Sequence, residues 1–227
     1  MASLPHTITP LETFAYRLLE LYQIIATIMA DVCVDTNPEL SYDRHTSNFV
    51  SIISHCIQSY SVVLRSKGLD RAHIYDAKTP NANSISDIGW IPPLYYTAVK
   101  CRNHRIRLHT VKLLEAAPHK EGMWDAKLAA AVARRVISIE EQELYNNIRM
   151  ANAFDLLGAP SAQEKLLPVL PEAYRLHELK VALPDDPTGR LVLRCNRRGE
   201  TGPWEVIVWV YDLRSELWSN LSRWTRC

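Results

Sequence analysis

Two histidines are the side chains in this sequence best suited to acid–base chemistry. His55 lies in an apolar stretch directly before Cys56, and His119 comes two residues before Glu121. An imidazole titrates near neutral pH, so a histidine beside a thiol or a carboxylate can act as a general acid or base. We identify His55 and His119 as candidate catalytic residues. The alternative for each is a hydrogen-bonded structural histidine, because pairing in space cannot be seen in a single sequence.

Four aromatic residues are candidates for a ligand-binding surface: Trp90, Tyr95, Tyr96 and Trp124. Apolar cavities that hold small molecules are lined by such side chains, with a few polar groups that orient the ligand. Aromatic residues of the hydrophobic core have the same composition, so both interpretations stay open.

Motifs for phosphate or metal binding are missing from the sequence. It contains no G-x-x-x-x-G-K-[ST] loop and no H-E-x-x-H, and only seven glycines in total. The five cysteines are scattered singly, which fits neither a disulfide framework nor a zinc site and favours a reducing compartment. We therefore expect no metal and no cofactor.

Helical patterns occupy the first two thirds of the chain. Thr9, Pro10 and Glu12 form the start signal of a helix that should extend to about residue 33. Further helices are expected over residues 42–65, 92–100, 103–116 and 124–152, with a surface loop over 68–89. These helices must position the candidate histidines and aromatic residues.

A basic cluster begins the helix expected over residues 103–116. Its arginines are Arg102, Arg105 and Arg107. Positive charge is unfavourable at a helix N-terminus, so these arginines should reach acidic partners. The expected acidic partners are Glu121, Asp125, Glu140 and Glu141. We predict structural roles for Arg102, Arg107, Glu121 and Asp125.

Beyond residue 171 the pattern changes to short strands separated by turn residues. The strands are expected over residues 174–183, 190–196 and 204–213. The predicted fold is mainly α: a bundle of antiparallel helices carrying a small C-terminal three-stranded antiparallel sheet. We expect a single domain over residues 1–227, with the helical bundle in 1–170 and with the hairpin sheet and a terminal helix in 171–227.

Composition and charge limit the classes of partner. The chain has 227 residues, of which 47% are hydrophobic and 22% charged, and its formal net charge is +1. Such a balance provides no general attraction to nucleic acid or to an anionic membrane. The N-terminus lacks the features of a secretory signal, and no apolar run reaches the roughly 18 residues of a membrane span. We expect an intracellular protein, cytoplasmic or nuclear.

The stretch from residue 91 to residue 141 resembles the C-terminal half of the fungal-specific regulatory region of zinc binuclear cluster transcription factors. The resemblance is carried by Pro92-Pro93-Leu94-Tyr95, Lys100-Cys101-Arg102, Trp124-Asp125 and Arg135-Val136, and it covers roughly residues 85–212. It implies a helical region that senses effectors or contacts partners. The family's six-cysteine zinc cluster is missing from this sequence, so we expect no specific nucleic-acid binding.

Three functions remain open on this basis. The first is a helical module that binds a small-molecule metabolite, a protein partner or a second copy of itself. The second is an enzyme of fungal secondary metabolism, of isomerase, cyclase or dehydratase type, with its pocket between the helices. The third is a remnant of a transcription factor. Fold resemblance alone does not decide among them.

Overall fold

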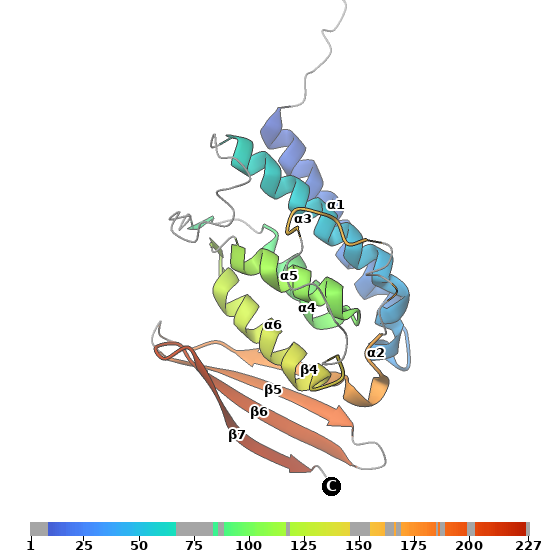
Figure 1. Ribbon diagram of the computed structural model, residues 1–227, viewed down its shortest axis with the longest axis vertical. Helices are drawn as coiled ribbons and strands as arrows, with labels where there is room; N and C mark the ends of the chain where they lie inside the picture. Colours follow the sequence, from blue (N-terminus) through green and yellow to red (C-terminus); the bar gives the residue numbers. More distant parts are fainter. Residues whose placement is uncertain are drawn as a thin grey trace, which may run out of the picture. The chain divides into compact units, whose positions relative to one another are not determined.

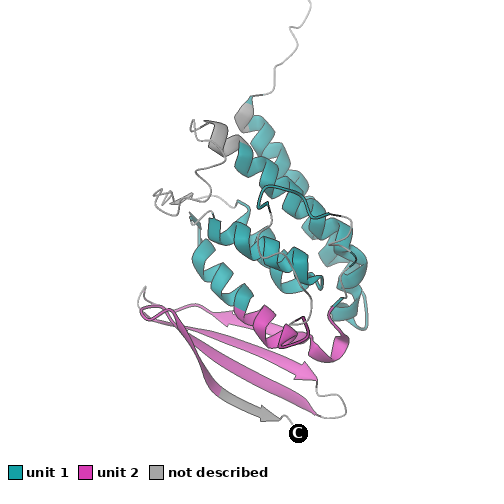
Figure 2. Cartoon of the chain, in the orientation of Figure 1, with its two compact units in different colours: residues 1–134, 148–169 teal, residues 135–147, 170–227 magenta. Residues whose placement is uncertain are grey.

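The computed structural model describes residues 9–66, 84–85, 89–116, 119–145, 155–161, 166, 169–184, 186, 189–198 and 203–225. The chain divides into two compact units (Figure 2). Unit 1 comprises residues 1–134 and 148–169, and unit 2 comprises residues 135–147 and 170–227. The division falls within one helix, after Arg134.

Unit 1 is built mainly from helices. They are α1 (Pro10–Val32), α2 (Pro38–Ser41), the 3₁₀ helix η1 (Tyr42–His45), α3 (Thr46–Ser66), α4 (Ile91–Lys100), α5 (His104–Ala116) and the first part of α6 (Ala126–Glu141). Helices α1 and α3 lie side by side (Figure 1), and both contact α4. The fully buried side chains Ile28, Phe49 and Leu94 contribute one residue each from these three helices to the core.

The predicted start of α1 is confirmed. The Thr9 hydroxyl accepts a hydrogen bond from the Glu12 N–H at 3.2 Å, and the Glu12 carboxylate accepts one from the Thr9 N–H at 2.8 Å. This reciprocal pair satisfies N–H groups that have no partner within the helix. Pro10 occupies the first helical position, where a missing N–H costs nothing.

Three two-residue strands interrupt the helices of unit 1: β1 (Ser84–Ile85), β2 (Lys120–Glu121) and β3 (Trp124–Asp125). Strand β2 pairs in parallel with β1 and antiparallel with β3. The rest of the loop expected over 68–89 lies outside the described residues, except for Gly89.

The helix expected over 124–152 is shorter at both of its described ends. Trp124 pairs with Glu121 in the β2–β3 hairpin, and the Asp125 carboxylate accepts N–H bonds from Lys127 and Leu128, so α6 begins at Ala126. At the other end Gln142 has a φ of 43°, a left-handed conformation that ends the helix. Residues 146–154 lie outside the described part of the chain.

Unit 2 contains a four-stranded antiparallel sheet in the order β4-β5-β6-β7. Its strands are β4 (Leu176–Ala182), β5 (Arg190–Arg198), β6 (Trp204–Asp212) and β7 (Leu217–Thr225); the 3₁₀ helix η3 (Glu172–Tyr174) precedes β4. The predicted fold class is therefore wrong. The chain has a mixed helix and sheet structure, the sheet has four strands rather than three, and a strand stands where a terminal helix was expected.

The turn before β7 explains why the chain returns as a strand. The Asp212 carboxylate accepts N–H bonds from Arg214 and Ser215, both at 3.0 Å, which closes a tight turn. Glu216 then adopts a left-handed φ of 57°, which reverses the chain into β7. Leu217 and Leu221 are both 68% exposed, so within residues 217–221, where side-chain burial is described, β7 shows no buried stripe of the kind that usually identifies a strand.

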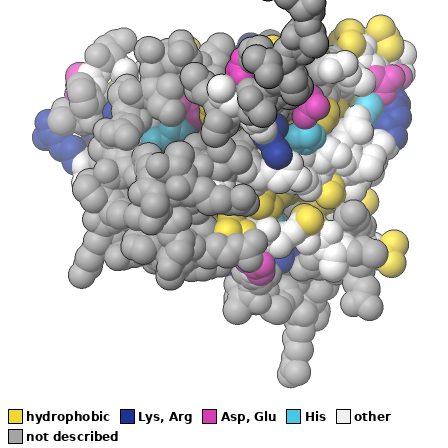
Figure 3. Space-filling model, turned by 90° about the horizontal axis from the view of Figure 1, so that it is seen from above, with side chains coloured by type: hydrophobic (Ala, Val, Ile, Leu, Met, Phe, Trp, Pro, Cys, Tyr) yellow, Lys and Arg dark blue, Asp and Glu magenta, His cyan; other side chains and the backbone are white. Residues whose placement is uncertain are grey.

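Acidic, basic and hydrophobic side chains of the described residues all appear on the face drawn in Figure 3. This mixture agrees with the net charge of +1. Among the described residues, no helix is both long and apolar enough to cross a membrane.

Candidate functional site

A buried carboxylate from β2 closes the N-terminus of α4. Glu121 is 1% exposed and accepts backbone N–H bonds from Gly89, Trp90 and Ile91, at 3.0, 3.0 and 2.9 Å. No side chain from α4's own N-cap residue, Trp90, provides a cap. The carboxylate replaces that local cap and places negative charge at the positive end of the helix dipole.

His119 belongs to the same cluster. Its Nε2 lies 2.6 Å from Oε1 of Glu121, and its ring centroid lies 5.4 Å from that of Trp90. The structure thus brings together His119, Trp90 and Glu121, three of the residues singled out in the sequence. The carboxylate of this pair is already held by three backbone groups, so the arrangement has the features of a structural cap.

His55 has a different partner. Its Nδ1 lies 3.5 Å from Oε2 of Glu20 on α1, and the Glu20 side chain is 59% exposed. The two candidate histidines therefore do not share a carboxylate. Their catalytic roles stay predictions.

The other predicted ligand-binding aromatics fall into separate clusters. The rings of Tyr95 and Trp124 lie 5.5 Å apart, and Tyr96 packs against Tyr42 and Phe49, both at 6.2 Å. Burial raises the pKa of Tyr95 to about 12 and also raises that of Tyr96. Both phenols are protonated near neutral pH, so neither offers a base there.

A buried ion cluster holds the other end of α4. Glu39 of α2 accepts a hydrogen bond from Lys100 at 2.6 Å and forms an ion pair with Arg102, whose side chain is 1% exposed. Glu39 was not among the acidic partners expected for the arginines. Arg107, also fully buried, donates from Nε to the carbonyl of Ala98 at 2.9 Å.

Three buried thiols show no sign of activation. Burial raises the pKa of Cys101 to about 11, that of Cys195 to about 12, and that of Cys56 as well. The thiolate is the reactive form, so these cysteines should be inert in the folded protein, whereas the exposed Cys33 should react.

We therefore expect iodoacetamide at mildly alkaline pH to alkylate Cys33 in the native protein and Cys56, Cys101 and Cys195 only after denaturation. Peptide mass spectrometry of native and denatured samples measures this directly. Rapid native labelling of Cys56 or Cys195 would contradict the burial described above.

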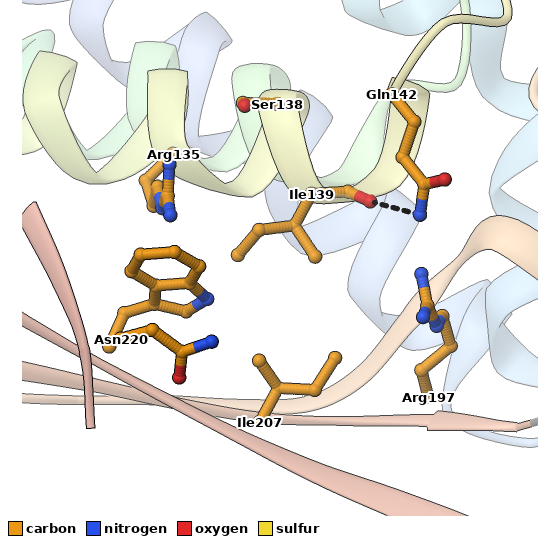
Figure 4. A pocket seen from close by; sticks show the side chains of 8 residues that line it. Arg135, Ser138, Ile139, Gln142, Arg197, Ile207 and Asn220 are labelled. Atoms are coloured by element: carbon orange, nitrogen blue, oxygen red, sulfur yellow. Dashed lines mark hydrogen bonds between the residues drawn. The ribbon is translucent and has the colours of Figure 1, made fainter. Parts of the chain in front are cut away.

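A pocket of about 230 Å³ lies within unit 2, between α6 and one face of the sheet (Figure 4). We call it the α6–sheet pocket. Its lining residues are Arg135, Ser138, Ile139 and Gln142 from α6, Arg197 from β5, Ile207 and Trp209 from β6, and Asn220 from β7.

Strand register places the sheet residues of the pocket on one face. Trp209 pairs with Asn220 of β7, and two residues earlier on β6 lies Ile207. Arg197 pairs with Glu205, which is two residues before Ile207. Residues directly opposite each other on neighbouring strands point to the same side of a sheet, and so do residues two apart on one strand.

A guanidinium group stacks on an indole in this pocket. The guanidinium carbon of Arg135 lies 3.2 Å from the ring centroid of Trp209. Nε of Arg135 and Nε1 of Trp209 are both buried and have no hydrogen-bond partner among the described residues. Buried donors without partners are costly, and in native structures they call for an explanation such as an ordered water, an ion or a bound ligand.

None of the candidate catalytic or ligand-binding residues from the sequence lines this pocket. Alternation along β6 indicates that Ile207 and Trp209 share a face. Nothing in the sequence indicates that α6 covers that face or that Arg135 stacks on Trp209. The α6–sheet pocket lies against the sheet, so the cavity expected between helices stays a prediction.

Comparison of the chain with protein-family models, with curated proteins and with solved structures finds no match. Among the described residues, no group of three or more histidine, cysteine, aspartate or glutamate side chains is placed to hold a metal ion.

Proposed function

We propose that this chain is a small-molecule-binding module and that its ligand site is the α6–sheet pocket. The observation that carries the proposal is the pair of buried donors, on Arg135 and Trp209, which have no partner within the described chain. A bound ligand that accepts their hydrogen bonds would remove this cost.

The chemistry of the lining favours binding over catalysis. Of the eight lining residues only Arg135 and Arg197 ionise, and arginine stays protonated at all physiological pH values. The pocket therefore offers no side chain that could exchange a proton near neutral pH as a general acid or base. The enzyme alternative rests on His55 and His119, which lie outside this lining.

The resemblance to fungal transcription-factor regulatory regions supports the same proposal. A regulatory region of that type implies effector binding, and the metabolite would then be the effector. We propose no specific nucleic-acid binding by residues 1–227, since their formal net charge is only +1. A protein partner or a homodimer is compatible with this role.

The test is a screen of a mixed set of small neutral, cationic and anionic compounds by ¹H–¹⁵N NMR. We expect at least one compound to shift the Trp209 indole and Asn220 side-chain signals, because both groups line the pocket. Ser138→Trp, which places a large side chain at the pocket, should abolish those shifts.

Ser219→Trp is the matched control. Ser219 is exposed like Ser138, but it pairs with Val210 and therefore points to the other face of the sheet. The control should bind as the native protein does. A screen in which no compound shifts the pocket signals would overturn the proposed function.

A further inference from the structure

Donor groups dominate the α6–sheet pocket. Arg135, Arg197 and Trp209 can only donate hydrogen bonds. The eight lining residues include no aspartate or glutamate. An occupant that satisfies these donors must supply acceptor atoms, and a negative charge is favourable beside an arginine.

Of the two arginines, Arg135 is the one whose charge lacks a counter-ion. Arg197 has Glu205 within 3.4 Å, whereas Arg135 has no carboxylate partner among the described residues. Stacking on Trp209 holds the Arg135 guanidinium in place, and burial lowers the pKa of Arg135. An anion bound here would offset that loss of solvation.

Two isoleucines define the apolar part of the pocket. Ile139 projects from α6 and Ile207 from the sheet, and they face each other across the space between Arg135 and Arg197 (Figure 4). The volume of about 230 Å³ is below the roughly 300–1,000 Å³ of sites that hold drug-sized ligands. The apolar part of the ligand should therefore be no larger than one ring.

We infer, on the basis of the proposed function, that the α6–sheet pocket binds a small carboxylic acid with a single flat apolar ring. The carboxylate accepts N–H bonds from Arg135, and the ring lies between Ile139 and Ile207. Planar guanidinium groups suit a carboxylate because two parallel N–H bonds can form at once.

Benzoate is the probe, and its neutral analogue benzamide and the ringless acetate are the comparisons. Isothermal titration calorimetry gives the affinities, and NMR shifts of the Trp209 indole locate the site. We expect benzoate to bind at least about tenfold more tightly than either comparison, since only benzoate has both the charge and the ring.

The decisive variant is Arg135→Gln, with Arg134→Gln as its matched control. Arg134 precedes Arg135 on α6 but forms an exposed ion pair with Glu115 and does not line the pocket. Arg135→Gln should weaken benzoate binding by about tenfold or more, and Arg134→Gln by less than about twofold. Arg135→Lys, which keeps the charge but loses the planar fork, should give an intermediate loss.

Three results would overturn the inference: no benzoate binding, equal binding of benzamide, or unchanged benzoate binding in Arg135→Gln. If Arg135→Gln fails to fold, unchanged binding in Arg135→Lys counts as the third. Any other compound from the mixed screen that shifts the pocket signals would then leave the proposed function standing. A screen in which no compound shifts them removes both proposals.

Discussion

Glu121→Ala is expected to lower the free energy of unfolding by roughly 3 to 5 kcal/mol, because three buried backbone N–H groups lose their acceptor. The affected amides are those of Gly89, Trp90 and Ile91, at the start of α4. Denaturation followed by circular dichroism measures the loss. Hydrogen exchange should show faster exchange at these three amides in the variant.

Two further variants separate the cap from a general packing effect. Glu121→Gln keeps one side-chain carbonyl oxygen and nearly the same side-chain volume but removes the negative charge. Its loss of unfolding free energy should therefore be smaller than that of the alanine variant. Gly89→Ala tests the same contact from the other side, since a Cβ there would lie 2.6 Å from Cδ of Glu121. A loss below about 1 kcal/mol in Glu121→Ala would show that the cap adds little.

Glu39→Gln is expected to lower the free energy of unfolding by roughly 3 kcal/mol, because it removes the carboxylate that pairs with the buried Arg102 and with Lys100. Removing one member of a buried ion pair leaves the remaining charge without that compensation. Chemical denaturation of the purified variant gives the value.

Glu115→Gln is the matched control for this second prediction. Glu115 also pairs with an arginine, Arg134, but the two side chains are 39% and 52% exposed. Exposed pairs contribute about 0 to 1 kcal/mol, so this variant should be nearly neutral. If Glu39→Gln and Glu115→Gln lowered the free energy of unfolding equally, burial would not be what makes the Glu39 ion pairs more important to stability.

Together these two networks hold both ends of α4. Glu121 places negative charge at the helix N-terminus, while Lys100 and Arg102 place positive charge at and just beyond its C-terminus. Both arrangements are favourable toward the helix dipole. Glu121, Lys100 and Arg102 therefore stabilise the two ends of α4. The ligand site that we propose is the α6–sheet pocket of unit 2.

Local patterns in the sequence were sufficient to predict features that depend on residues close together along the chain. The capping box of α1 involves residues three apart, and the start of α4 depends on the prolines at 92 and 93. Both could be predicted because the groups that interact are close along the chain. Strand β7 was missed because the sequence of residues 217–225 mixes apolar and polar residues without a regular alternation.

Contacts between distant segments were decided only by the tertiary structure. Glu121 lies 30 to 32 residues from the amides it binds, and Arg102 lies 63 residues from Glu39. Periodicity shows which residues of β6 share a face, but it cannot show that α6 covers that face or that Arg135 stacks on Trp209. Such pairings depend on how whole elements pack, and a single sequence records the faces of each element without recording their partners.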